Sequence, residues 1–273
     1  MMTTSKEFLF IGGCPRSGTS LLSSLLGNLE GVAIVQDFTA IHQLKRAALR
    51  TIFVLNQMPS SEHHQAILNG LPKIDLRTTE FFPEFLSLSP EACLNAFKLP
   101  SGLILRFFIQ YMDIFLFRDF NVSDPRKDRG QGTQYLENIS LNKLLRCETM
   151  SDLFIELLVQ SSKTLSNNVD VSVICEKTPE NLSNIDVLSM LTEPFGFRFL
   201  HLVRDPVSVF GARRQRVDCT VEEFVHFFKK YSEPAFKAGN CNGFSTIKYE
   251  DLIANPVASL NNSINELGLD KLL

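Results

Sequence analysis

The chain has 273 residues, a hydrophobic fraction of 44% and a formal net charge of −3. This length and composition suffice for a full core in one α/β domain or two small ones, and we expect a single domain over residues 1–273. Lysines and arginines are scattered along the chain and leave no basic footprint, so we expect no nucleic acid among the partners.

The spacing of the cysteines and the hydropathy of the chain exclude several classes of protein. The six cysteines include no closely spaced pair, which argues against a zinc knuckle or a redox motif and favours reduced, buried thiols. The apolar run before Gly12 is too short for a signal peptide. The stretch from Leu103 to Phe117 fails as a bilayer span because polar residues interrupt it at Arg106, Gln110 and Asp113. We therefore expect a soluble, cytoplasmic protein without a transmembrane segment.

The first predicted elements are a strand from Phe8 to Ile11 and a helix that begins near Leu21. Between them, residues 12–20 read Gly-Gly-Cys-Pro-Arg-Ser-Gly-Thr-Ser. Such a glycine-bounded turn aims backbone N–H groups and the positive end of a helix dipole at one point. This segment is therefore predicted to bind a phosphate or sulfate group.

The kind of anion that the turn binds is predicted from how its sequence differs from that of a standard phosphate loop. From Gly13 the spacing is that of a phosphate loop, but Thr19 occupies the lysine position, and the positive charge is on Arg16. A γ-phosphoryl group normally needs that lysine and magnesium, whereas a sulfuryl group carries less charge and transfers without a metal. The turn thus disfavours ATP, and we expect no metal.

Downstream, strand and helix signals alternate around a central region, about 40–170, that is predicted to be largely helical. A second strand is predicted from Val32 to Val35, and the loop from Ser123 to Gly132 is expected to be solvated. Three more apolar, β-branched or aromatic runs are predicted to be strands: Val171 to Cys175, Phe197 to Val203 and Phe244 to Tyr249.

Each late helix has a recognisable start. Asp205 with Pro206 predicts a helix through about Arg216. Thr220 with Glu223 forms a capping box, and Asn255 with Pro256 precedes a helix from Ala258 to Leu267 that ends at Gly268. The alternation predicts a three-layer α/β/α fold of the phosphate-loop type with a central parallel sheet, and with ligands at the carboxyl ends of its strands.

Four segments, in this order, resemble the sulfotransferase family, whose donor is 3′-phosphoadenosine 5′-phosphosulfate. They are Pro15 to Ser20, Glu176 to Pro179, Val203 to Pro206 and Lys248 to Leu252. The first is similar to the 5′-phosphosulfate loop and the third to the 3′-phosphate element. In these motifs the chain is most similar to bacterial and tyrosylprotein-type sulfotransferases. The resemblance implies a sulfotransferase acting on a hydroxyl or amine acceptor by in-line displacement.

The resemblance assigns the donor contacts in the first turn. Arg16 would neutralise the bridging oxygen between phosphate and sulfate. The backbone amides of Ser17, Gly18, Thr19 and Ser20, with the hydroxyls of Thr19 and Ser20, would bind the 5′-phosphosulfate. Glycine at 18 allows the backbone to approach an anion closely.

The same resemblance assigns the 3′ end. Arg204 would grip the 3′-phosphate. The serine that normally joins it two helical turns later is replaced by Ala212, and Ser208, one turn earlier on the same face, is expected to substitute. Arg216 is favoured among the basic residues that end this helix, and the alternative is macrodipole complementation. Tyr249 is similar to a tyrosine that touches the adenine region, and a core tyrosine is the alternative.

An acceptor must lose a proton as it attacks sulfur, so a base is expected near the loop. Asp37, after the second strand, falls where tyrosylprotein sulfotransferases carry a glutamate, and His42 is the rival. Lys177, at the end of its strand, is a candidate for stabilising the transferring group, with a structural ion pair to Glu176 or Glu180 as the alternative.

The acceptor itself stays open between a small molecule, a glycan, a lipid and a peptide, and the protein between a monomer and a homodimer. Aromatic clusters near Phe81 and Phe107 are expected to be mostly core. Two other classes compete with the main interpretation. One is a metal-dependent kinase or nucleotidase of the same fold, and the other is a protein that binds an adenine nucleotide without turnover.

Overall fold

The structure is a computed structural model that describes residues 6–36, 139–163, 171–239 and 242–272. The chain divides into two compact units. One consists of Met1–Phe38 with Ser161–Leu273, and the other of Thr39–Gln160. Asp37, His42 and the predicted loop from Ser123 to Gly132 lie outside the described residues.

The first unit is built on a parallel sheet, as the strand and helix alternation predicts. Its strands are β1 (Glu7–Gly13), β2 (Val32–Gln36), β3 (Val173–Lys177), β4 (Phe199–Val203) and β5 (Phe244–Lys248). The order is β2-β3-β1-β4-β5, and all neighbouring pairs are parallel. From β1 the chain crosses to β2 on one side, and it later returns to place β4 on the other side of β1. The carboxyl ends of β1 and β4 therefore form the switch point at which ligands bind in open α/β sheets.

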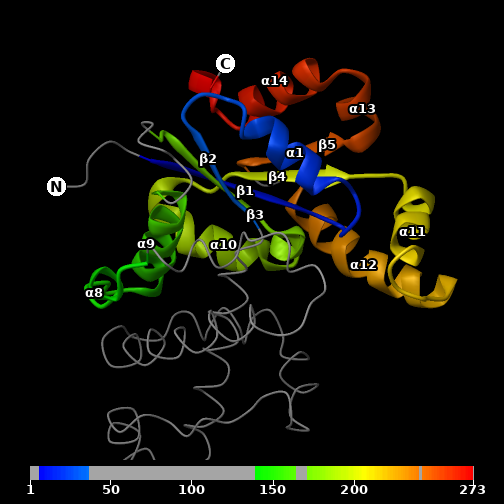
Figure 1. Ribbon diagram of the computed structural model, residues 1–273, viewed down its shortest axis with the longest axis horizontal. Coiled ribbons are helices and arrows are strands. Elements are labelled where there is room, and N and C mark those ends of the chain that lie inside the picture. The colour runs from blue at the N-terminus through cyan, green and yellow to red at the C-terminus, as the bar shows by residue number, and fades with distance from the viewer. Residues whose placement is uncertain (1–5, 37–138, 164–170, 240–241, 273) are drawn as a thin grey trace, which may run out of the picture. The chain divides into compact units, whose positions relative to one another are not determined.

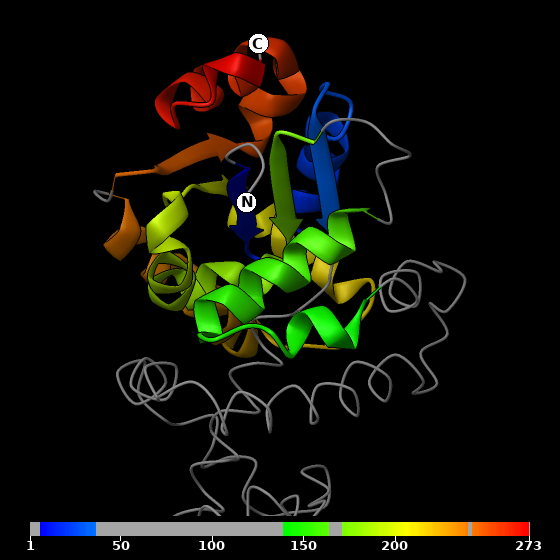
Figure 2. The same cartoon turned by 90° about the vertical axis from the view of Figure 1, so that its left-hand side faces the viewer.

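Helices cover both faces of this sheet, which completes the predicted three layers (Figure 1, Figure 2). On one face lie α1 (Thr19–Leu26), α13 (Tyr249–Ala254) and α14 (Pro256–Glu266). They enclose a core that includes Leu9 and Ile11 of β1, and the short η5 (Asp270–Leu272) also contributes to it.

The opposite face is covered by η3 (Pro179–Asn184), α10 (Ile185–Thr192) and α12 (Val221–Ala238). The short η4 (Glu193–Phe195) follows α10, and α11 (Pro206–Arg214) lies beyond the carboxyl end of β4. Alternation along a strand explains the two faces, because Phe8 and Phe10 point away from the side that Leu9 and Ile11 occupy.

The described part of the second unit is helical, with α8 (Leu141–Leu144) and α9 (Met150–Lys163), whose last three residues belong to the first unit. Thr149 and Asp152 cap the start of α9 reciprocally, since the Thr149 amide donates to Oδ2 of Asp152 at 3.0 Å and the Asp152 amide donates to Oγ1 of Thr149 at 3.0 Å.

Several element boundaries differ from the prediction. The first helix begins at Thr19 rather than near Leu21, because Gly18 is its N-cap. The helix expected to reach Arg216 ends at Arg214. The last strand stops at Lys248, and Tyr249 begins α13. The capping residues Asp205, Thr220 and Asn255 act as predicted, each accepting from a backbone amide three residues later.

Candidate functional site

The turn between β1 and α1 has the form of an anion cradle. The Ser17 amide donates to the Cys14 carbonyl at 2.9 Å, and Arg16 and Gly18 adopt left-handed backbone angles, with φ of 82° and 104°. Gly18 caps α1, whose first N–H groups have no partner within the helix and carry the positive end of its dipole. These groups are placed to meet an anion.

Two glycines are needed by this geometry. A Cβ on Gly18 would lie 2.7 Å from the Tyr249 ring, and its φ is one that side chains rarely adopt. A Cβ on Gly13 would lie 2.5 Å from the Leu202 carbonyl oxygen and 2.9 Å from Oγ of Ser17. The turn therefore packs directly against β4 and the start of α13.

The structure brings the two predicted anion elements together. Arg204, which directly follows β4, donates from its guanidinium to the Arg16 carbonyl at 3.3 Å. The same guanidinium stacks on the Tyr249 ring, with Cζ 4.2 Å from the ring centroid. Arg16, Gly18, Arg204 and Tyr249 thus form one cluster at the switch point between β1 and β4.

Two polar atoms at this cluster have unused hydrogen-bonding capacity. Among the described residues, neither Oγ of Ser17 nor Nε of Arg204 has a hydrogen-bond partner, although both atoms are buried. Buried polar atoms normally find partners, and orphaned ones are common where a ligand binds. The Ser17 hydroxyl and the Arg204 guanidinium are therefore suited to hold an anion.

Asp205 fixes the start of α11 beside this cluster. Its carboxylate accepts from the Ser208 amide at 2.8 Å. Hydrogen bonds from the Ser208 side chain and, second, from this amide lower the pKa of Asp205. The Asp205 amide donates to Oε1 of Glu250 at 3.1 Å and so joins β4 to α13. Ser208 is exposed in the first turn of α11, a position compatible with the predicted role of substituting for the serine that Ala212 replaces.

Lys177 ends β3, next to β1, and is almost completely buried. Its Nζ donates to Oγ of Ser20 at 3.4 Å, so the lysine reaches the first turn of α1. The neighbouring Glu176 carboxylate accepts from Thr178 at 2.6 Å and from Asn181, whose amide also donates to the Ile11 carbonyl at 3.2 Å. This buried network ties η3 to β1 and β3.

The basic residues at the end of α11 differ in their surroundings. Arg216 is exposed beyond the helix. The Arg213 guanidinium stacks 3.7 Å from the Phe227 centroid, and its charge lowers the pKa of Cys14 against the larger effect of burial, which raises that pKa to about 12. Within the described part of the chain, Nε of Arg213 has no hydrogen-bond partner. The only sequence signal for this position was its membership of the basic cluster.

A family model described as sulfotransferase family matches residues 9–271. The chain belongs to the sulfotransferase family. No curated protein matches it.

Solved structures similar to this sulfotransferase include three sulfotransferases of low sequence identity. The sulfotransferase domain of the Synechococcus PCC 7002 olefin synthase is 18% identical, with 98% of this chain and 75% of that chain covered and a TM-score of 0.39. The sulfotransferase domain from the curacin biosynthetic pathway is 14% identical, with 97% of this chain and 75% of that chain covered and a TM-score of 0.46. Sulfotransferase STF9 from Mycobacterium avium is 14% identical, with 97% of this chain and 64% of that chain covered and a TM-score of 0.43.

Two searches of the described residues of this sulfotransferase gave no further site. They contain no group of three or more histidine, cysteine, aspartate or glutamate side chains placed to hold a metal ion. Among the helices of the described segments, none is long and apolar enough to cross a membrane.

Proposed function

We propose that this sulfotransferase moves a sulfuryl group from 3′-phosphoadenosine 5′-phosphosulfate to a hydroxyl or amine acceptor by in-line displacement. The observation that carries the proposal is the hydrogen bond from Arg204 to the Arg16 carbonyl. It unites the two elements expected to bind the 5′ and 3′ anions of one nucleotide. The orphaned Ser17 hydroxyl fits such a ligand, and Gly13 and Gly18 allow the turn to pack against Leu202 and Tyr249.

Each residue of the cluster has a proposed part. The α1 amides from Thr19 onward and the Ser17 and Ser20 hydroxyls bind the 5′ anion. Arg204 binds the 3′-phosphate, aided by Ser208, while Tyr249 supports the guanidinium and borders the adenine. Arg216 was the predicted third basic contact, and Arg213 is the better placed alternative.

The donor supplies a sulfuryl group and a phosphate leaving group. As the acceptor oxygen or nitrogen bonds to sulfur, the S–O bond to the bridging oxygen breaks and its electron pair stays with that oxygen. Arg16 and Lys177 stabilise this developing charge, and Lys177 is held ready by its contact with Ser20.

The acceptor proton passes to Asp37, with His42 as the rival base. For Asp37→Asn we expect kcat to fall by about a hundredfold to ten-thousandfold while the donor Kd stays unchanged. Equilibrium binding beside steady-state kinetics checks this. A weakened donor Kd with normal turnover would contradict the assignment, and the same loss in His42→Asn alone would transfer the role to His42.

Calorimetric titration of adenosine 3′,5′-bisphosphate, ATP with magnesium, AMP and adenosine tests the proposed class. We expect the bisphosphate to bind most tightly, because only it offers both anions to the two elements. Tighter binding of ATP with magnesium would favour a kinase or nucleotidase. Tight bisphosphate binding without transfer to a broad acceptor panel would favour a binding protein without turnover.

A further inference from the structure

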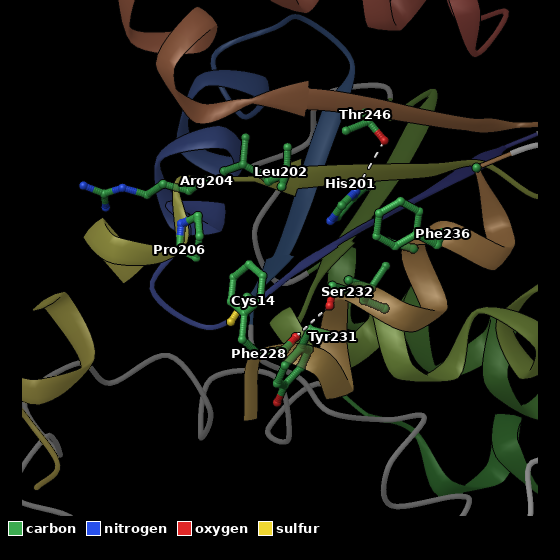
Figure 3. Close-up of a pocket in the computed structure, with 14 residues that line it drawn as sticks. Cys14, His201, Leu202, Arg204, Pro206, Phe228, Tyr231, Ser232, Phe236 and Thr246 are labelled. Atoms are coloured by element: carbon green, nitrogen blue, oxygen red, sulfur yellow. Dashed lines mark hydrogen bonds between the residues drawn. The ribbon is translucent and has the colours of Figure 1, made fainter. Parts of the chain in front are cut away.

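A second feature of the first unit is a cavity of about 640 Å³ on the opposite face of β4 from the core around Leu9. It lies between the carboxyl halves of β4 and β5 and the helix α12 (Figure 3). Its lining includes Cys14, Leu182, His201, Phe228, Ala235 and Thr246. Ligand pockets of small molecules commonly have this size.

The strand register explains which residues of the sheet border the cavity. Phe10, Phe199 and Phe244 are paired in register across β1, β4 and β5, and the Phe199 and Phe244 rings stack at 5.4 Å. Two residues further along each strand, on the same face, the register places Gly12, His201 and Thr246. Phe199 and Leu182 occupy the place of a Cβ at Gly12, whereas His201 and Thr246 line the cavity.

Helix α12 does not refill that space. Where it borders the cavity it contributes Ser232, Ala235 and Gly239 between larger aromatic side chains. The Ser232 hydroxyl donates to the Phe228 carbonyl of its own helix at 3.2 Å and so is satisfied without a ligand. Small residues of the helix thus line the cavity together with His201 and Thr246 of the strands.

Among the described residues that line the cavity, Arg204 alone has a charged side chain. The cavity-lining Arg204 extends away from it, toward Tyr249 (Figure 3). Burial raises the pKa of Cys14 to about 12 and lowers that of His201 to about 4, so both are neutral near pH 7. The His201 ring is paired through Nδ1 with Oγ1 of Thr246 at 3.3 Å. A neutral apolar ligand is favoured against such a lining, because burying a charged group is costly unless it is paired.

One end of the cavity belongs to the anion-binding turn. Cys14 lines it and is followed directly by Pro15 and Arg16. Arg204 and Pro206, which follow β4, line the cavity as well. A molecule in the cavity would therefore lie next to both of the predicted anion elements.

We propose that this cavity is the acceptor site and that it takes a neutral, elongated apolar alcohol whose hydroxyl lies at the Cys14 end. The inference rests on the proposed sulfuryl transfer, since it assigns the acceptor of that reaction. The apolar body of the acceptor is buried against Leu182, Phe228 and Ala235.

The test uses straight-chain primary alcohols from hexanol to dodecanol, titrated calorimetrically into the full chain saturated with adenosine 3′,5′-bisphosphate. We expect affinity to rise about fourfold for each added methylene until the cavity is full. Ala235→Phe, which fills the cavity from α12, should weaken alcohol binding by about tenfold or more and leave the bisphosphate Kd unchanged.

Ala258→Phe is the matched control, because Ala258 is exposed on α14 and does not line the cavity. This variant should change neither the affinity for alcohols nor the affinity for the bisphosphate. Should Ala235→Phe fail to fold, Ser232→Leu narrows the same space from a half-buried position and should show a smaller loss in the same direction. Transfer of sulfate to decanol should fall in parallel with alcohol affinity.

The outcomes separate the two proposals. If the bisphosphate binds but no alcohol does, or if Ala235→Phe leaves alcohol binding intact, the acceptor assignment is overturned and the proposed transfer stands. If Ala235→Phe weakens the bisphosphate as much as the alcohols, the cavity holds the nucleotide and the assignment is again wrong. If alcohols bind as expected and the bisphosphate does not, the proposed sulfuryl transfer is wrong, and the cavity then has no role as its acceptor site.

Discussion

Arg204 is the residue on which the proposed nucleotide site most depends. Its guanidinium donates to the Arg16 carbonyl and stacks on Tyr249, and Nε remains for a further acceptor among the described atoms. A lysine can reproduce neither the planar stack nor a two-point grip on phosphate. The identity of this side chain, beyond its charge, is therefore expected to matter.

For Arg204→Lys we expect the bisphosphate Kd to rise by about tenfold or more, with the folded structure retained. Arg146→Lys is the control, since Arg146 is exposed in the other unit and the same replacement should leave the Kd unchanged. Calorimetry on both variants measures the effect. Equal affinities in Arg204→Lys and the parent would remove Arg204 from the 3′-phosphate site.

His201 makes stability depend on pH because burial lowers its pKa to about 4 from an unfolded value of 6.5. Below pH 6.5 the unfolded chain binds a proton that the folded chain does not, so stability falls as pH drops from about 6.5 toward 4. Between pH 7.5 and pH 5 this residue should account for a loss of about 2 kcal/mol. The loss should level off below pH 4, where both states are protonated.

The measurement is urea unfolding at both pH values for the parent and for His201→Gln, which keeps a polar partner for Thr246. From pH 7.5 to pH 5, the free energy of unfolding should fall by about 2 kcal/mol less in the variant than in the parent, whatever the variant's stability at pH 7.5. Identical pH dependence in the two proteins would show that His201 titrates normally.

Among the elements, the turn before α1 depends on a backbone that only glycine adopts without strain. At Gly18 a Cβ would meet the Tyr249 ring at 2.7 Å, in addition to the cost of φ at 104°. We expect Gly18→Ala to destabilise the protein by about 1–3 kcal/mol and to weaken bisphosphate binding. Urea unfolding and calorimetry measure the two effects.

Gly211→Ala provides the opposite case within α11. Gly211 is exposed in the helix, and a Cβ there would meet nothing within 4 Å. The same substitution should stabilise the protein by about 0.5–1 kcal/mol without changing bisphosphate affinity. If both glycine variants behaved alike, the strain assigned to Gly18 would be wrong.

Local chemistry explains why the elements themselves are largely predictable. Asp205, Thr220 and Asn255 each accept from the amide three residues on, and this contact needs no distant partner. One of the boundaries that differ from the prediction involves a tertiary contact. Tyr249 begins α13 instead of ending β5, and it stacks on Arg204 from another part of the chain.

At the scale of the whole molecule, the nucleotide site draws on the ends of β1, β3, β4 and β5. No one of these segments forms the site alone, so ligand binding is linked to unfolding of the whole sheet. With bisphosphate at one hundred times its Kd, we expect hydrogen exchange of the slowest amides in these strands to slow by about a hundredfold. ATP with magnesium at the same concentration is the comparison and should protect them less, whereas equal protection by both would contradict the proposed nucleotide preference.

The amino-acid sequence alone determined the parallel α/β fold, the glycine-bounded turn before α1 and the place of Arg204 after a strand, because caps, glycine positions and strand patterns are local and their physics is short-ranged. It did not reveal that Arg213 stacks on Phe227, or that His201 and Thr246 border a cavity. Those depend on strand order and register, which set Gly12, His201 and Thr246 side by side although they lie far apart in the chain. Only the tertiary structure decides which residues are neighbours, because the hydrogen bonds of a sheet can join strands that are far apart in the sequence.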